Sequence, residues 1–339
     1  MRHMAQKQTD PPNENPIEKI ATSVYPAFAL LAGMKLDLFT PLKKGPMEAE
    51  QIASAIGVSS TKLNALLYAL VIAGLLKVKG NKFSNSDIAD TYLVNGSPSC
   101  VLDIHELLST MWGAALRTCD SIKTGLPQAK LDYAKMQPDE LAQFFRGEHP
   151  YAVECGNDFV KRFDFSSYKN LLDVGGGSGG LSIAVAEACP NILATVLDLP
   201  VVTPITQQYI DESDTKERIN VESADVVREQ IQGSYDVAVM TSFLQVLSPE
   251  DARRAINNIS NVIIPGGDVY IRGYGIIDNS RVSPEKLVGF NLVYINVYDE
   301  GQAYTEQEHK DWLEEAGFGL FKRTILSDGS SIISARKRI

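Results

Sequence analysis

Short apolar runs alternate with amphipathic stretches through the second half of this chain. An apolar run ending at Val174 is followed by a glycine-rich loop and by the apolar-rich stretch 181–188, a pattern that predicts strand, tight turn and helix. Similar apolar runs predict further strands at 192–198, 219–225, 235–242, 268–274, 320–326 and 330–336. Amphipathic helices are expected at 249–263 and 305–317, and Pro265-Gly-Gly is expected to form a turn. This alternation predicts an α/β fold with a doubly wound sheet.

The first half has a helical pattern instead. Helices are expected at 49–58 and at 60–74, the second capped by Ser59 or Ser60 and ended by Gly74, and a hairpin around Gly80-Asn81 follows. Two helices and a hairpin are typical of a winged helix, which raises the alternative of DNA binding. The second helix carries only one basic residue, Lys62, and a recognition helix needs several polar or basic side chains. A structural or dimerising role is therefore favoured.

Composition narrows the class of protein. The 339 residues carry a formal net charge of −10 and contain no apolar run long enough to span a bilayer, so neither nucleic acid nor a membrane is an expected partner. The polar start lacks an apolar signal core, and the four cysteines form no C-x-x-C pair. We expect a cytoplasmic protein with reduced thiols, no metal, a disordered arm at 1–16, a mostly helical, winged-helix-like domain at 17–167 and an α/β domain at 168–339.

The glycine loop at the end of the first strand allows two cofactor readings. Gly175, Gly177 and Gly180 fit the dinucleotide fingerprint G-x-G-x-x-G, whereas Gly175, Gly177 and Gly179 fit D-x-G-x-G, which resembles class I S-adenosylmethionine (SAM) methyltransferases. Asp173 precedes the loop, and its carboxylate would repel a pyrophosphate but attract the ammonium and sulfonium of SAM. Asp173 therefore favours SAM over NAD.

Two more acids follow later strands. Asp198 ends the second predicted strand, where a carboxylate accepts hydrogen bonds from ribose hydroxyls, and Asp225 lies beyond the third strand, placed for an adenine amino group. Either acid alone would equally suit a helix cap or a solvated loop. Strand, loop and acids in this order are much harder to explain without a nucleoside ligand.

The whole pattern resembles the small-molecule O-methyltransferase family, which includes hydroxyindole, caffeate and polyketide-tailoring enzymes. The resemblance is carried by the helical first half, by the glycine loop and by the stretch from Thr305 to Phe318. It implies a class I SAM-methyltransferase, Rossmann-like domain, an intertwined homodimer formed through the helical half, and SAM as cofactor. The implied cofactor residues are Asp173, Gly175, Gly177, Gly179, Asp198, Leu199, Asp225, Val226 and Thr241.

The chain departs from this family at the catalytic base. In the family a histidine after the fourth strand removes the acceptor's proton, but the matching position holds Gln245, which has no useful basicity and can only orient a group. Three readings follow: the acceptor needs no deprotonation, another residue supplies the base, or the fold catalyses a different reaction. Other candidate bases are His105, His149 and His309, the last in a polar helix where a surface position is expected.

The stretch before the glycine loop is expected to line the acceptor pocket. Arg146 can grip a carboxylate with two parallel hydrogen bonds, and His149 can position the acceptor, although pairing of Arg146 with Glu148 or Glu154 at the surface is an equal alternative. The pocket walls are expected to be aromatic, with Trp112, Phe145, Tyr151, Tyr294 and Tyr298.

An acceptor with a carboxylate and no removable proton fits both Arg146 and Gln245. One branch of the resembling family S-methylates 4-methylthio-2-hydroxybutyrate on the way to dimethylsulfoniopropionate, and this acceptor is the leading hypothesis. O-, N- or C-methylation of an aromatic or polyketide metabolite is the alternative. A winged-helix regulator and an NAD-dependent oxidoreductase are rival functions of other classes.

Overall fold

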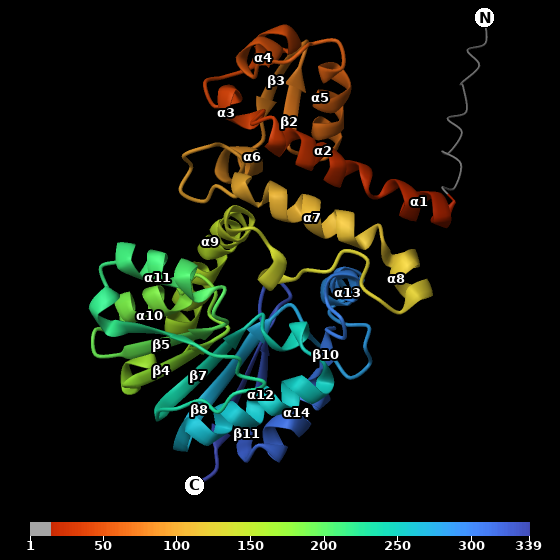
Figure 1. Ribbon diagram of the computed structural model, residues 1–339. Coiled ribbons are helices and arrows are strands. Elements are labelled where there is room, and N and C mark those ends of the chain that lie inside the picture. Colours follow the sequence, from red (N-terminus) through yellow and green to blue (C-terminus); the bar gives the residue numbers. More distant parts are fainter. Residues whose placement is uncertain (1–14) are drawn as a thin grey trace, which may run out of the picture. The chain divides into compact units, whose positions relative to one another are not determined.

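The computed structural model describes residues 15–339 (Figure 1). The chain divides into two compact units, and the boundary between them falls between Ser109 and Thr110. The arm expected at 1–16 lies almost entirely outside the described residues, and the first helix already begins at Pro16. The second unit includes the long helix before the glycine loop, and apolar side chains of this helix pack with the sheet. All four cysteines are free, and no helix in the described range is both long and apolar enough to cross a bilayer.

The first unit is built from six helices and a small sheet within its described residues. The helices are α1 (Pro16–Thr22), α2 (Tyr25–Lys35), α3 (Phe39–Leu42), α4 (Ala49–Ala55), α5 (Leu63–Ile72) and α6 (Asp87–Tyr92). Strands β1 (Met47–Glu48), β3 (Lys82–Asn85) and β2 (Leu76–Lys79) form an antiparallel sheet in this order. The hairpin expected around Gly80 is confirmed. The expected cap is wrong, because α5 begins at Leu63 after Lys62, and the hydroxyl of Ser59 bonds to the N–H and the hydroxyl of Thr61 before the helix begins.

The second unit is a seven-stranded sheet with helices on both faces. Helix α7 (His105–Ala115) runs from one unit into the other, and the remaining helices are α8 (Thr118–Thr124), α9 (Pro138–Arg162), α10 (Gly180–Ala188), α11 (Thr203–Glu212), α12 (Pro249–Val262), α13 (Glu285–Val297) and α14 (Glu306–Glu315). The strands are β4 (Asn170–Val174), β5 (Leu193–Asp198), β6 (Ile219–Ser223), β7 (Tyr235–Thr241), β8 (Ile263–Gly273), β11 (Phe318–Ile325) and β12 (Ser331–Lys337). A small pair, β9 (Ile276–Ile277) and β10 (Tyr304–Thr305), lies beside this sheet.

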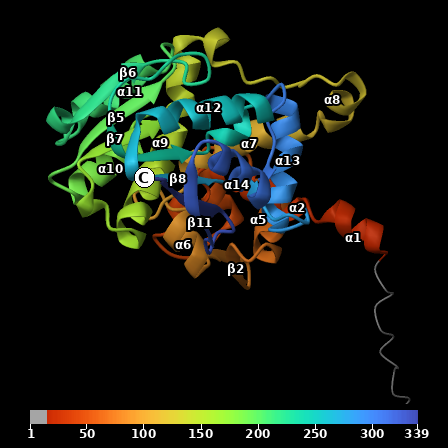
Figure 2. The same ribbon diagram turned by 90° about the horizontal axis from the view of Figure 1, so that it is seen from below.

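The strand order is β11-β12-β8-β7-β4-β5-β6, and the five strands from β8 to β6 are parallel. Strand β12 is antiparallel to both of its neighbours. Apolar side chains of α12 and α14 pack on one face, and those of α9, α10 and α11 pack on the other (Figures 1 and 2). The doubly wound prediction is thus confirmed. Because parallel strands end at the same edge, the loops after β4, β5, β6 and β7 meet there.

The turn expected at Pro265-Gly-Gly is not observed. Strand β8 runs through these residues, and its pairing with β7 shifts register between Tyr235 and Val237. Proline and glycine occur at bulges within strands as well as at turns. The sequence Pro265-Gly-Gly therefore does not distinguish a bulge from a turn. The bulge absorbs the extra residues without interrupting the strand.

His309 is buried, so its expected surface position is wrong. Only 1% of the residue is exposed, and its Nδ1 lies 2.9 Å from the carbonyl oxygen of Thr305. Trp312 packs against it at a ring separation of 5.5 Å. Burial lowers the pKa of His309 to about 4. The helix looks polar because its buried face is small and includes the imidazole itself.

This buried imidazole makes the stability of the second unit sensitive to acid. Its folded-state pKa of about 4 lies below its ordinary value of 6.5, so folding requires the neutral form. The stabilising effect is complete above pH 6.5 and is lost between 6.5 and 4, by up to about 1.4 kcal/mol per pH unit. We expect urea unfolding of the His309→Gln variant to show a shallower loss of unfolding free energy over this range. Equal pH dependence in both proteins would contradict the assignment.

Candidate active site

The loop between β4 and α10 can form only because its glycines tolerate left-handed backbone. Gly175, Gly177 and Gly179 have φ values of 65°, 57° and 74°. The loop is also tightly enclosed: a Cβ added to Gly177 would lie 2.9 Å from the ring of Phe145. The loop therefore presents backbone, rather than side chains, at the carboxyl edge of the sheet.

Asp173 lies beneath this loop and is fully buried. The hydroxyl of Ser182 donates to its Oδ2 at 2.8 Å, whereas Oδ1 has no hydrogen-bond partner among the described residues. Burial, together with the charge of Asp198, raises the pKa of Asp173 to about 7. A buried carboxylate with an unused oxygen favours a cationic donor nearby.

Asp198 connects the end of β5 to the loop. Its Oδ2 accepts the N–H of Gly177 at 2.8 Å, and its Oδ1 accepts the N–H of Leu199 at 2.7 Å. Burial raises the pKa of Asp198, while these two N–H donors act in the opposite direction. Each carboxylate oxygen keeps a further acceptor position, so the group can still bind hydroxyls.

Asp225 follows β6 and begins a turn, in which the N–H groups of Arg228 and Glu229 donate to its carbonyl oxygen. It accepts the N–H of Val227 at 3.0 Å and forms an ion pair with Arg228 at 2.8 Å. Its carboxylate is thus held at the same edge of the sheet as Asp198.

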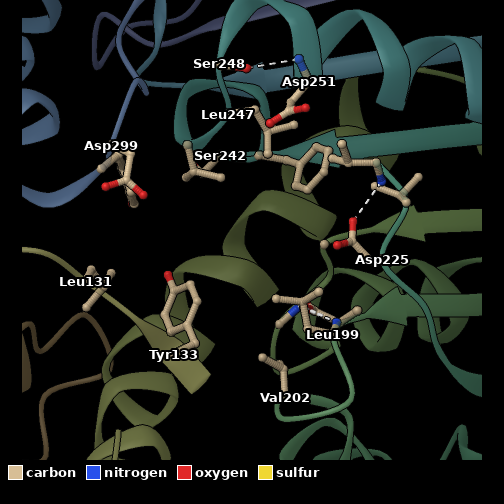
Figure 3. Close-up of a pocket in the computed structure, with 18 of the residues that line it drawn as sticks. Leu131, Tyr133, Leu199, Val202, Asp225, Ser242, Leu247, Ser248, Asp251 and Asp299 are labelled. Atoms are coloured by element: carbon tan, nitrogen blue, oxygen red, sulfur yellow. Dashed lines mark hydrogen bonds between the residues drawn. The ribbon is translucent and has the colours of Figure 1, made fainter. Parts of the chain in front are cut away.

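These loops enclose a cavity of about 550 Å³, a normal size for a small-molecule site (Figure 3). Of the residues expected from the sequence, those that line it are Gly175, Gly177, Asp198, Leu199, Asp225, Val226, Phe145 and Tyr298. The loop and the acids therefore occupy one end, and aromatic residues the other. Figure 3 shows the hydroxyl of Tyr133 pointing into the space between these parts.

Six of the residues expected to hold the cofactor or to form the pocket walls do not line the cavity. Asp173, Gly179 and Thr241 lie behind its wall, and the hydroxyl of Thr241 is buried without a partner among the described residues. The remaining three are aromatic, and they are Trp112 in α7, Tyr151 in α9 and Tyr294 in α13. The ring of Tyr294 lies 6.0 Å from that of Tyr298, so it supports a residue that does line the cavity.

Gln245 is buried beside the cavity wall. It lies in the 3₁₀ turn Leu244–Val246 and is 7% exposed. A Cβ added to Gly275 would lie only 2.4 Å from the Cβ of Gln245, so the glutamine fills the space that this glycine leaves open. The neighbouring Val246 and Leu247 line the cavity, and Gln245 itself does not.

The two polar residues expected to bind the acceptor lie elsewhere on α9. The Nδ1 of His149 is 2.9 Å from the hydroxyl of Ser178 in the glycine loop, and its ring stacks on Tyr209 at 4.1 Å. Burial lowers the pKa of His149. Arg146 is exposed, and it forms no ion pair in the part of the chain that the structure describes. Neither residue lines the cavity, and His149 instead supports the loop.

Several lining residues were not expected from the sequence, among them Lys130, Tyr133, Ser242, Phe243, Asp251, Asp299 and Glu300. They come from the segment before α9, from the end of β7, from α12 and from the turn after α13. Among these residues, Ser242 stands out by its backbone conformation. Its φ of 51° marks a strained turn directly after β7.

The cavity is electronegative. Five carboxylates line it, from Asp198, Asp225, Asp251, Asp299 and Glu300, against two cations. Both cations are already paired, Arg228 with Asp225 and Lys130 with Asp299. The cavity therefore has a net negative charge and suits a cationic ligand.

Comparison with known proteins agrees with this geometry. Residues 122–319 match the model of the O-methyltransferase domain, and residues 19–95 match that of the O-methyltransferase dimerisation domain. The tetracenomycin polyketide synthesis 8-O-methyl transferase TcmO of Streptomyces glaucescens is 27% identical over 95% of this chain and 96% of its own length. The N,N-dimethyltransferase OxyT of Streptomyces rimosus is 23% identical over 88% of this chain and 89% of its own.

The fold also matches that of solved methyltransferase structures. Human N-acetylserotonin methyltransferase, solved in complex with SAM, superposes with a TM-score of 0.81 at 21% identity, over 97% of this chain and all of that one. The two family models between them cover both units, and the first of them alone spans more than half of the chain. This chain therefore belongs to the O-methyltransferase family and is a SAM-dependent methyltransferase.

Proposed function

We propose that this enzyme methylates a thioether sulfur, with 4-methylthio-2-hydroxybutyrate as the leading acceptor. The proposal is carried by Gln245, which we place, on the family resemblance, at the position of the family's catalytic histidine. The histidines support the same reading, because none of the three in the described residues lines the cavity. His149 contacts Ser178, His309 is buried at Thr305, and His105 is the first residue of α7. A thioether attacks with its own lone pair, so it needs no base.

The cofactor end of the cavity suits SAM. When bound, SAM supplies a methyl group on a sulfonium, which makes the methyl carbon electrophilic. We assign the ribose hydroxyls to Asp198 and the adenine to Asp225 and Val226, which line the cavity. We assign attraction of the ammonium to the charge of Asp173, which acts from beneath the loop and whose Oδ1 has no partner among the described residues. The glycine loop leaves room for the ligand because it has no side chains there.

Charge also favours a thioether. Transfer to an uncharged sulfur turns one sulfonium into another, so the positive charge stays inside the cavity throughout the reaction. Five lining carboxylates and several aromatic rings stabilise a cation at both ends of that path. A hydroxyl acceptor would instead leave an uncharged ether and a proton, and no imidazole of the described residues lines the cavity to take that proton.

The acceptor's carboxylate needs a cation, and Lys130 is a better candidate than Arg146. Lys130 lines the cavity beside Tyr133 and Tyr298, whereas Arg146 is exposed on α9. Its ion pair with Asp299 lies at the surface and contributes no more than about 1 kcal/mol, so an acceptor carboxylate can exchange with Asp299.

A primary or secondary amine is the second candidate acceptor. The electronegative cavity suits its cationic form, and the relative OxyT is named as an N,N-dimethyltransferase. An amine must lose a proton before it attacks, so it still requires a proton acceptor that a thioether does not.

We also infer a homodimer formed through the first unit. Residues 19–95 match a dimerisation domain, and large apolar side chains of α1, α2 and α5 are exposed on this unit, namely Ile17, Ile20, Tyr25 and Ile72.

An acceptor panel tests the proposed reaction. With SAM, the enzyme should release S-adenosylhomocysteine faster with 4-methylthio-2-hydroxybutyrate than with 1-naphthol or tyramine, and kcat should change little between about pH 6 and 8 because no base titrates. Gln245→Ala should lower kcat by less than about tenfold, since its amide moves no proton. Preferred turnover of the hydroxyl acceptor, or a steep loss of kcat below pH 7 at saturating SAM, would contradict the proposal.

The assignment of Asp173 predicts a pH-dependent cofactor affinity. Its pKa of about 7 means that the carboxyl must lose a proton to hold the SAM ammonium. SAM binding measured by calorimetry should therefore weaken below pH 7 by up to about tenfold per pH unit in the wild type, and much less in Asp173→Asn. As a control, 5′-methylthioadenosine lacks the amino-acid part and should show no such difference. Parallel SAM curves for both proteins would refute the assignment.

The Lys130 assignment has a matched control on the same enzyme. Lys130→Ala should raise the KM for 4-methylthio-2-hydroxybutyrate by about tenfold and leave that for 3-methylthio-1-propanol, which lacks the carboxylate, nearly unchanged. Arg146→Ala should alter neither KM. If Arg146→Ala raised the KM for the carboxylate acceptor more than Lys130→Ala does, Arg146 on α9 would be the residue that binds the carboxylate.

A further inference from the structure

One end of the cavity is formed by two segments of the second unit. The first, residues 126–133, is called the wall segment here, and it contributes Lys130, Leu131 and Tyr133 to the lining. The second, residues 297–300, lines the cavity with every one of its residues (Figure 3). Each residue of the wall segment is at least partly exposed, so packing alone does little to hold it in place.

The same two segments also border a second cavity, of about 260 Å³. Tyr298, Asp299 and Glu300 line both cavities, and Leu126 and Pro127 line the second one. A wall that borders two cavities has fewer packing partners than a core segment, so its position depends more on its hydrogen bonds.

The wall segment is hydrogen-bonded to the end of α13. The N–H of Ala129 donates to the carbonyl oxygen of Asn296 at 2.9 Å, and the N–H of Leu131 donates to that of Val297 at 2.9 Å. Both carbonyl groups belong to the last turn of α13, where they have no partner within the helix. Lys130, which lines the larger cavity, lies between the two donors. The register of these two bonds therefore determines where the Lys130 ammonium lies.

The side chain of Asn296 holds the place where these bonds are made. The residue is fully buried, and its Oδ1 accepts the hydroxyl of Ser121 in α8 at 2.5 Å. Its Nδ2 donates to the hydroxyl of Thr118 at 3.0 Å and to the carbonyl oxygen of Leu292 at 2.6 Å. The hydroxyl of Ser121 in turn accepts the N–H of Gln128 at 3.1 Å. Asn296 thus connects α8, α13 and the wall segment at one buried point.

A buried amide specifies one arrangement more strictly than an apolar side chain does. A leucine would fill a similar volume and would contact its neighbours equally well in slightly shifted positions. The amide loses free energy when one of its bonds is broken in a buried place, so it disfavours every arrangement in which a partner is displaced. The Asn296 side chain therefore selects one register of the wall segment on α13.

We propose that Asn296, together with Ser121, is a positioning residue for the acceptor, because it fixes the register of the wall segment and thereby the place of the Lys130 ammonium. This proposal rests on the proposed role of Lys130 in binding the acceptor carboxylate. Neither Asn296 nor Ser121 lines the larger cavity, so both act on the acceptor through the wall segment. The cofactor end is formed by the glycine loop and by the ends of β5 and β6, and SAM binding should not depend on them.

Steady-state kinetics of the full-length enzyme with two acceptors test this role. Asn296→Leu should raise the KM for 4-methylthio-2-hydroxybutyrate by about tenfold and that for 3-methylthio-1-propanol, which lacks the carboxylate, by less than about threefold. The KM for the carboxylate acceptor should rise more than kcat falls, because the displaced group binds the acceptor. The Kd for SAM should stay within about twofold of the wild-type value.

Ser121 offers a smaller change and a rescue. Ser121→Ala removes one oxygen atom and should change the two KM values in the same direction as Asn296→Leu, whereas Ser121→Thr keeps the hydroxyl and should behave as wild type. The double variant should be little worse than Asn296→Leu alone, because both changes break the same connection. Ser260→Ala is the matched control. It removes a buried hydroxyl that donates to the carbonyl oxygen of Ala316, away from both cavities, and should leave both KM values unchanged.

Hydrogen exchange gives a result that does not depend on the acceptor. In Asn296→Leu and Ser121→Ala, a peptide covering residues 126–133 should exchange at least about fivefold faster than in wild type. If wild type does not methylate 4-methylthio-2-hydroxybutyrate, while exchange is faster and the KM of the best acceptor rises, the proposed acceptor is wrong and the positioning role stands. Unchanged exchange, or variants of lower stability that keep wild-type KM values for the acceptor, would overturn the positioning role.

Discussion

The hydrogen bond from the N–H of Gly177 to the carboxylate of Asp198 joins the ends of two neighbouring parallel strands. It requires the left-handed loop glycines, the parallel pairing of β4 with β5, and an acid at the last residue of β5. This bond holds the loop with its backbone toward the cavity, and the Asp198 carboxylate lies in the cavity wall. The rest of the cofactor site, including Asp225 after β6, is placed by the same alignment of strand ends.

The second organising property is negative charge in a partly enclosed space. The cavity carries more carboxylates than cations, and the buried Asp173 adds a further acid beneath the glycine loop. Carboxylates gathered in this way cost folding free energy when no ligand is bound, and a bound sulfonium group compensates their charge. A reaction that begins and ends with a sulfonium uses this environment at every stage, and it makes the absence of an imidazole at position 245 chemically consistent.

The sequence was sufficient for the architecture because the signals for it are local. Apolar runs, the glycine loop and the acids after strands predicted five parallel strands and most of the cofactor end of the cavity. The sequence-based prediction was wrong where one pattern is compatible with two structures. Pro265-Gly-Gly lies at a bulge within β8 and not at a turn, and the polar helix around His309 contains a buried imidazole. Arg146 was singled out by its chemistry, but the helical phase of α9 leaves it exposed. Lys130 and Asp299 reach the cavity from distant segments, which no local pattern reveals.

The central claim is that methyl transfer by this enzyme moves no proton. The most direct test is to count protons released per S-adenosylhomocysteine formed, in a weakly buffered solution with a pH indicator, during turnover of the acceptor that the enzyme uses best. Methylation of a thioether releases none, because one sulfonium replaces another, whereas methylation of a hydroxyl or an amine releases one. We predict a ratio near zero, and a ratio of about one proton per methyl group would contradict the account.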